Sequence, residues 1–232
     1  MLAVVLEEGD VEHRVTVGNI GQFIPVIHGR DSKISNYDAR SDPRIFRNEW
    51  PTYSSLYPRI LYLVRDPRAA LVSYYHHYQV TTGDSATSLD TFIATYLRDG
   101  CIRSWEPRLI RWDKQVAHWM ERANKQPVMI VKYETIHRDR RKTLQGVARF
   151  CGIQAPEDAI ATAVERGRFD AMRFDEERFG AEAYPQEPGR RGWFLRRGLI
   201  DGWKEELSPN SRKAIEGEFQ SVMEAMGYTL GP

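Results

Sequence analysis

The sequence is poor in cysteine and has no long apolar run. Its two cysteines, Cys101 and Cys151, lack the spacing of a metal-binding motif and are too few for a disulfide framework. This cysteine usage predicts a reduced, cytoplasmic protein. No apolar segment approaches the roughly 18 residues that a transmembrane helix needs. The short run at residues 2–6 has no basic region before it, so it is not expected to be a signal peptide.

The chain also lacks a strong net charge of either sign. The chain of 232 residues has 33 basic and 32 acidic side chains, which gives a formal net charge of +1. This near-neutral balance argues against a general attraction to nucleic acid or to an acidic membrane. Lysine is scarce, with 7 Lys against 26 Arg. Arginine suits the bidentate recognition of anions, although most of these side chains are expected to be solvated. The composition therefore leaves room for local anion sites, and no credible metal cluster is present in the sequence.

Strand and helix patterns alternate along the chain. Apolar segments predict strands at residues 43–51, 60–64 and 128–134, the first of them running into a loop at Asn48. Apolar spacing and capping residues predict helices near residues 2–6, 15–23, 89–97, 107–120 and 156–166, with others after Pro67, before Gly152 and after Ser208. We therefore expect an α/β fold, with one domain over residues 1–232 and a central parallel sheet of about four to five strands between helices on both faces. Residues 175–192, rich in Gly, Pro and charge, are predicted to form a mobile lid.

The most informative stretch begins with the apolar residues 60–64, which predict a strand buried on both faces. Asp66 is a good N-cap and Pro67 a good first residue for the helix that follows. Arg65 then lies at the carboxyl end of a central strand, where open α/β sheets bind ligands. Ser73 lies two turns into the helix. Together these groups suit a phosphate, although an ordinary strand, turn and helix with Arg65 paired to a surface carboxylate would give the same pattern.

Four motifs occur in order along the chain. They are Tyr62-Leu63-Val64-Arg65-Asp66-Pro67-Arg68 with Ser73, then Lys132-Tyr133-Glu134, then residues 167–173 around Phe169, and finally Arg196-Arg197-Gly198 with Trp203-Lys204. In this order they resemble the motifs of the sulfotransferases that use 3′-phosphoadenosine-5′-phosphosulfate (PAPS). Each motif alone is weak, but the set makes coincidence improbable, and it implies the P-loop-NTPase-like architecture of that family.

The resemblance implies specific roles and partners. Two groups of residues would bind the nucleotide: Arg65, Ser73, Arg196, Arg197 and Gly198 at the 3′-phosphate, and Tyr133 and Phe169 at the adenine. PAPS would be the co-substrate and no metal would be required. The acceptor would be a hydroxyl or amine of a small molecule, lipid or carbohydrate, a homodimer is left open, and no nucleic-acid partner is expected. Trp50, Tyr53, Tyr74 and Tyr75 could line an acceptor pocket or equally be packing residues.

The candidate catalytic base departs from the common family pattern. Many members use a His in a K-T-H motif, two residues before a Pro at a strand end. In the matching stretch here, Glu49 takes the His position, Asn48 the Thr position and Arg47 the Lys position, before Pro51. We therefore predict Glu49 as the general base, with Arg47 beside it. His28 is the competing candidate, but it lies well before this strand.

One family segment has no counterpart in these 232 residues. The loop that binds the 5′-phosphosulfate, of the type P-K/R-S-G-T/N-T-W, is not found, and neither is a G-x-x-x-x-G-K-[ST] phosphate loop. In the family that loop directly precedes the first helix, which corresponds to residues 2–6 here. Either Met1 is an internal or misassigned start of a longer enzyme, or the chain is a nucleotide-binding remnant without catalysis. The intact downstream motifs favour the first hypothesis.

Overall fold

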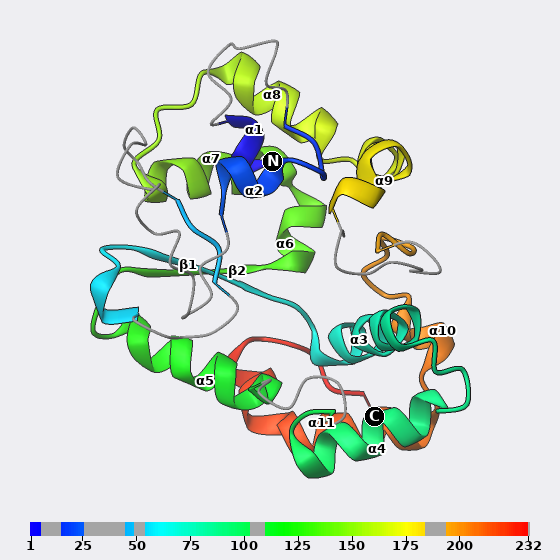
Figure 1. Ribbon diagram of the computed structural model, residues 1–232. Helices are drawn as coiled ribbons and strands as arrows, with labels where there is room; N and C mark the ends of the chain where they lie inside the picture. The colour runs from blue at the N-terminus through cyan, green and yellow to red at the C-terminus, as the bar shows by residue number, and fades with distance from the viewer. Residues whose placement is uncertain (6–14, 26–44, 49–53, 103–109, 184–193, 232) are drawn as a thin grey trace. The chain divides into compact units, whose positions relative to one another are not determined.

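The computed structural model describes residues 1–5, 15–25, 45–48, 54–102, 110–183 and 194–231. Within these ranges helices predominate and two strands, β1 (Ile60–Val64) and β2 (Val128–Lys132), pair in a sheet (Figure 1). The chain forms two compact units, each built from two separate stretches. The first unit comprises Met1–Leu61 and Arg138–Pro188, and the second comprises Tyr62–His137 and Gly189–Pro232.

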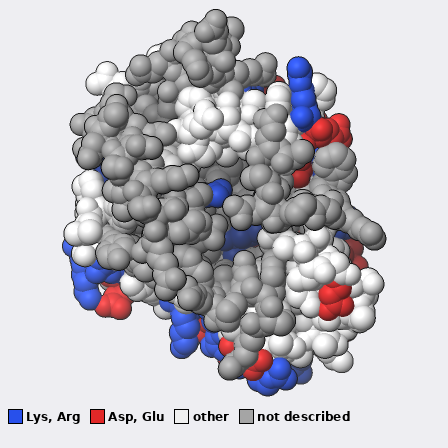
Figure 2. All heavy atoms as spheres, in the orientation of Figure 1, with Lys and Arg blue, Asp and Glu red and all other residues white. Residues whose placement is uncertain are grey.

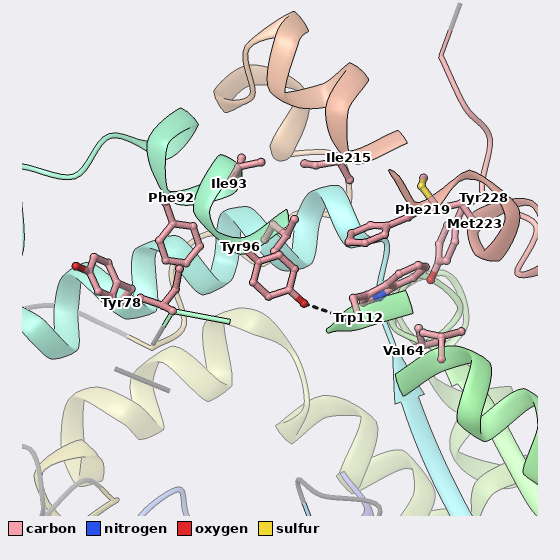
Figure 3. Packing of buried hydrophobic residues seen from close by; sticks show 13 residues of the cluster. Val64, Tyr78, Phe92, Ile93, Tyr96, Trp112, Ile215, Phe219, Met223 and Tyr228 are labelled. Carbon is pink, nitrogen blue, oxygen red and sulfur yellow. Dashed lines mark hydrogen bonds between the residues drawn. The ribbon is translucent and has the colours of Figure 1, made fainter. Parts of the chain in front are cut away.

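The second unit contains most of β1, all of β2 and several helices. These helices are α3 (Pro67–Thr82), α4 (Leu89–Asp99), α5 (Trp112–Ala123), α6 (Tyr133–Arg138), α10 (Trp203–Glu206) and α11 (Pro209–Ala225). Helix α5 packs against β2, and α11 packs against α3, α4 and α5. In Figure 3, side chains of α4 and α11 converge with Trp112, and the Tyr96 hydroxyl lies 2.8 Å from the Trp112 backbone N–H, from which it accepts a hydrogen bond. This aromatic core supports the strand ends described below.

The first unit has its own, smaller core. Its helices are α1 (Leu2–Val5), α2 (Ile20–Phe23), the 3-10 helix η3 (Ser54–Leu56), α7 (Arg140–Cys151), α8 (Glu157–Arg166) and α9 (Phe169–Ala183). Helices α1, α7 and α8 pack on one another. Their apolar side chains meet around Leu144, Ile160 and Ala163, all of which are buried. Packing of this kind stabilises a helix as short as α1, which would be marginal alone.

The strand β1 was predicted at the residues where it is found, but its predicted burial on both faces is wrong. Tyr62 and Val64 face the core of the second unit, where the Tyr62 ring lies 5.7 Å from that of Trp119 in α5. Side chains alternate along a strand, so Leu63 points to the opposite face, and it is 60% exposed. The apolar run therefore predicted the strand. It did not predict the burial of each face, because that depends on which elements pack against the strand.

The α/β class is confirmed, but the described residues contain fewer strands than the four to five expected. Of the strand predicted at residues 43–51, only 45–48 are described, and they contain a single bridge residue, Arg47. The backbone N–H of Arg47 donates to the Pro25 carbonyl at 2.8 Å. The strand predicted at residues 128–134 ends at Lys132, because Tyr133 begins α6.

Capping residues placed several helices correctly. The Asp66 carboxylate accepts from the Arg68 backbone N–H at 2.9 Å, and Pro67 is the first residue of α3. Ser208 caps α11 in the same way through the Ser211 N–H. Gly152 ends α7 with φ 79°, a left-handed conformation that glycine adopts without strain. These local signals are strong because each satisfies a backbone group that the helix itself leaves unpaired.

One long helix was not predicted. Helix α9 runs from Phe169 to Ala183, so residues 175–183 of the predicted lid are helical. The rest of that segment, 184–192, lies outside the described residues. Helix α9 is rich in charge and its apolar pattern is weak, which explains why composition suggested a loop.

The exposed charges of the described residues are mixed in sign. Figure 2 shows Lys and Arg close to Asp and Glu at several places on the face drawn, as expected from the net charge of +1. Among the described helices, none is long and apolar enough to cross a bilayer.

Truncating Phe219 tests the importance of the core in the second unit. Phe219 is completely buried in α11, with its ring 5.5 Å from that of Trp112. We expect Phe219→Ala to lower the free energy of unfolding by about 3–5 kcal/mol, because the lost contacts leave a cavity. Urea denaturation measures the change, and Gln220→Ala, at the exposed neighbouring position, is the control. Equal stability of the two variants would contradict this view of the core.

Candidate functional site

The candidate site is built around Arg65, which follows the last residue of β1. Its Cζ lies 4.3 Å from the centre of the Tyr133 ring, at the end of β2. Its Nη2 donates to the Leu199 carbonyl at 3.0 Å, and its Nε is buried without a hydrogen-bond partner among the described residues. Among the described residues no carboxylate pairs with Arg65, so they do not provide the surface ion pair of the alternative interpretation. A buried donor without a partner is uncommon, and it fits an anionic ligand.

The structure brings three of the four motif segments together in the second unit. Arg65 follows β1, Tyr133 begins α6 directly after β2, and Leu199 lies in the segment before α10. The two strands end at the same edge of the sheet, as expected for parallel neighbours. Gly198, next to Leu199, has φ 64°, a conformation that favours glycine. The strand ends therefore place a cation beside an aromatic ring and an irregular backbone segment.

A network of hydrogen bonds holds the backbone peptide group between Arg65 and Asp66. The Arg65 carbonyl accepts from the Trp112 Nε1 at 3.0 Å, and the next peptide N–H, that of Asp66, donates to the Glu134 Oε1 at 2.9 Å. The other carboxylate oxygen of Glu134 accepts from the Tyr228 hydroxyl at 3.3 Å. Burial, followed by the charge of Glu134, raises the pKa of Tyr228 above its ordinary value, so this hydroxyl remains a donor.

Arg68 lies at the centre of a second set of buried contacts. Its Nη2 lies 2.6 Å from the Asp66 Oδ2, its Nη1 pairs with Glu216 of α11, and its Cζ lies 4.2 Å from the centre of the Trp203 ring. Burial alone would lower the pKa of Arg68, but the hydrogen bonds and charges of Asp66 and Glu216 raise it above its ordinary value. Arg68 therefore ties the start of α3 to α10 and α11.

Two further arginines, Arg196 and Arg197, carry their own carboxylate partners. Both Arg196 Nη atoms donate to Glu206, at 3.1 Å and 2.6 Å, and Arg197 donates to Glu205 at 2.6 Å. The His76 Nε2 of α3 lies 2.7 Å from the Glu206 Oε2. Burial alone would raise the pKa of Glu206, but hydrogen bonds from Arg196 and His76 lower it below its ordinary value.

Chemically, this part of the second unit can bind an anion and a flat ring. Arg65 supplies a half-buried cation, the segment with Arg196 and Arg197 supplies two partly exposed ones, and Tyr133 supplies an aromatic ring. The described residues contain no group of three His, Cys, Asp or Glu side chains that could hold a metal ion.

Comparison with known proteins decides the family. The model of the sulfotransferase domain family matches residues 2–227, nearly the whole chain. The chain belongs to this family. The motif resemblance in the sequence is thereby confirmed, and the match treats these residues as one domain, as predicted.

Relatives of this sulfotransferase domain are distant in sequence. It is 23% identical over 194 residues to the amine sulfotransferase of Oryctolagus cuniculus, covering 79% of this chain and 62% of that protein. It is 22% identical over 242 residues to the 3-beta-hydroxysteroid sulfotransferase of Cavia porcellus, covering 100% of this chain and 80% of that protein. The chain thus spans less than two thirds of the amine sulfotransferase.

Solved structures show the same fold. The mouse sulfotransferase SULT7A1 complexed with PAP superimposes with a TM-score of 0.63 at 20% identity, covering 83% of this chain and 69% of that one. Retinol dehydratase in a complex with retinol and PAP gives a TM-score of 0.65 at 20% identity, covering 82% and 57%. The sulfotransferase domain described here therefore has the fold of those proteins.

The remaining predicted residues of the sulfotransferase domain differ in how they are placed. Ser73 is exposed on α3. Phe169 is the first residue of α9 and is half-buried in the first unit. Arg47 is exposed at its bridge. Glu49 and its competitor His28 lie outside the described residues, so the choice of base stays a prediction.

Of the four aromatic residues considered for an acceptor pocket, the structure describes two. Tyr74 and Tyr75 pack against the core of the second unit, with ring centres 5.4 Å from that of Phe92 in each case. This placement supports the packing alternative for both. Trp50 and Tyr53 lie outside the described residues.

Sequence reasoning missed the carboxylates of this site. Glu134 was noticed only as the residue after Tyr133, and no role was given to Glu206 or His76. The signal for Glu134 was present, because it is a charged residue close to the end of an apolar strand. Such a residue needs a specific partner, here the Asp66 N–H. Nothing in the sequence indicates which arginine would pair with Glu206.

Proposed function

We propose that this sulfotransferase domain binds PAPS and its product PAP and transfers the sulfuryl group to a hydroxyl or amine of a small-molecule acceptor. The observation that carries the proposal is Arg65, a half-buried cation at a strand end beside Tyr133, whose buried Nε has no hydrogen-bond partner among the described residues. The family match supports the same ligand class. PAPS, when bound, would supply the sulfuryl group that the acceptor receives.

The 3′-phosphate would be held by groups from three segments. Arg65 would donate from the end of β1, and the Ser73 hydroxyl from the exposed face of α3. Arg196, Arg197 and the Gly198 backbone would donate from the segment before α10. Each charge-assisted hydrogen bond of this type contributes about 1.5–3 kcal/mol. Arg196 and Arg197 would exchange their present carboxylate partners for the phosphate.

The adenine and the acceptor would use other residues. Tyr133 would place its hydroxyl beside the adenine, and Phe169 would offer a flat apolar face. Glu49 would take the proton of the acceptor, with Arg47 nearby, because sulfuryl transfer needs a base at the attacking oxygen or nitrogen. A cytoplasmic location is proposed from the low cysteine content, which is too small for a disulfide framework. A homodimer stays a prediction for sedimentation analysis.

Calorimetry with the 232-residue chain tests nucleotide recognition. We expect PAP to bind at least about tenfold more tightly than 5′-AMP, because only PAP carries the 3′-phosphate that Arg65 would bind. Equal affinities would contradict the proposal.

A transfer assay with PAPS and amine and hydroxysteroid acceptors tests turnover separately. Sulfated product would establish the transferase. Binding of PAP without sulfated product would contradict the proposed transfer and leave nucleotide binding alone.

A further inference from the structure

Glu134 binds the backbone that carries the candidate phosphate ligand. It is the second residue of α6, and only 6% of it is exposed. Its Oε1 accepts from the Asp66 backbone N–H at 2.9 Å, and its Oε2 from the Tyr228 hydroxyl at 3.3 Å. A buried carboxylate is stable only with such partners. The two bonds therefore account for a charged residue at this depth.

The bond to Asp66 fixes one particular peptide group. The Arg65 carbonyl and the Asp66 N–H belong to the same peptide plane, and side chains hold both of its polar atoms. Trp112 Nε1 donates to the carbonyl at 3.0 Å, and Glu134 accepts from the N–H. Because a peptide unit is planar, these two bonds set the direction in which the chain leaves β1. The Arg65 side chain starts from that fixed point.

The Asp66 carboxylate does not take part in this task. Its Oδ1 accepts from the Arg68 N–H and Nε, and its Oδ2 from the Arg68 Nη2. That side chain is used to cap α3 and to pair with Arg68. Glu134 therefore links the backbone directly after Arg65 to the residue next to Tyr133, in addition to the pairing of β1 with β2.

We infer that Glu134 is a positioning residue of the 3′-phosphate site. By binding the Asp66 N–H, it aligns Arg65 over Tyr133 and keeps the guanidinium where the phosphate would bind. This inference rests on the proposed function, because it assigns Arg65 to that phosphate. Displacement of a ligand-binding group by about 1 Å can cost roughly 10²-fold in an organised site.

The bond to Tyr228 provides the matched control. Tyr228→Phe removes a hydrogen bond from the same carboxylate but leaves the Asp66 N–H bonded to it. Glu134→Ala removes both bonds. Glu134→Gln keeps an amide oxygen for the Asp66 N–H, and its NH₂ can donate to the Tyr228 hydroxyl oxygen. If Glu134 had only a structural role, all three variants would keep the same preference for PAP over 5′-AMP.

The experiment measures the Kd of PAP and of 5′-AMP for each folded variant, with the denaturation midpoint alongside. We expect the preference for PAP to fall at least about tenfold in Glu134→Ala, to persist in Glu134→Gln, and to be unchanged in Tyr228→Phe even where its midpoint is lower. If Glu134→Ala does not fold, Glu134→Asp, whose shorter side chain withdraws from the Asp66 N–H, carries the same expectation.

Two results would overturn the inference in different ways. A folded Glu134→Ala or Glu134→Asp protein with the wild-type preference for PAP would overturn the role of Glu134 and leave the proposed function intact. A wild-type protein that does not prefer PAP over 5′-AMP would overturn the phosphate site itself, and the role of Glu134 with it.

Discussion

Replacing Arg68 with alanine is expected to lower the free energy of unfolding by about 3–5 kcal/mol, the usual loss when one partner of a buried ion pair is removed. The variant would leave Asp66, which is 7% exposed, without the guanidinium that now binds both of its oxygens. It would also remove the stacking on Trp203, whose ring centre is 4.2 Å from the Arg68 Cζ. Urea denaturation followed by circular dichroism measures the loss.

An exposed arginine provides the control for this prediction. Arg98 pairs with Asp99 at 3.0 Å, but its side chain is 69% exposed, so Arg98→Ala should change stability little. Similar losses of stability in Arg68→Ala and Arg98→Ala would mean that burial does not strengthen the contribution of the Arg68 contacts. Arg68→Lys is expected to fall between them, because it keeps the charge and loses the two-pronged contact.

Replacing Arg65 with glutamine is expected to weaken PAP binding by roughly 10–150-fold, the equivalent of one charge-assisted hydrogen bond of about 1.5–3 kcal/mol. Affinity for 5′-AMP should change much less, because 5′-AMP has no 3′-phosphate. Calorimetry with both nucleotides measures the two values. The comparison between nucleotides separates a lost phosphate contact from a general distortion of the site.

The exposed Arg149 of α7 provides a matched control substitution for the Arg65 experiment. Arg149→Gln changes the net charge by the same amount and should leave both affinities unchanged. If Arg65→Gln weakened PAP and 5′-AMP equally, Arg65 would be supporting the site without contacting the 3′-phosphate, and the residue assignment would need to change.

Local signals predicted the elements around the site well. The apolar run gave β1 at Ile60–Val64, and Asp66 and Pro67 gave the start of α3. Each of these signals acts over a few neighbouring residues, so the sequence contains all the information that is needed. The exposure of Leu63, by contrast, depends on which elements cover the sheet, and α9 was missed because its stability does not come from a strong apolar stripe.

The site was only partly predictable for the same reason. That Arg65 and Tyr133 meet follows from two neighbouring strands ending at one edge. The pairing of Arg196 with Glu206, and of Glu206 with His76, depends on how the segment before α10 turns against α3. That turn is set by tertiary packing, which the spacing of charged residues in the sequence does not reveal.

The division of the chain into two interleaved units has a consequence for the order of folding. The second unit draws on Tyr62–His137 and Gly189–Pro232, so its core closes only when Phe219 and Met223 of α11 meet Trp112. Contacts this distant in sequence form late, because a long loop must close before they can contribute. During synthesis, Arg65 and Tyr133 would therefore be made early, whereas the core of the second unit would close only once α11 is available.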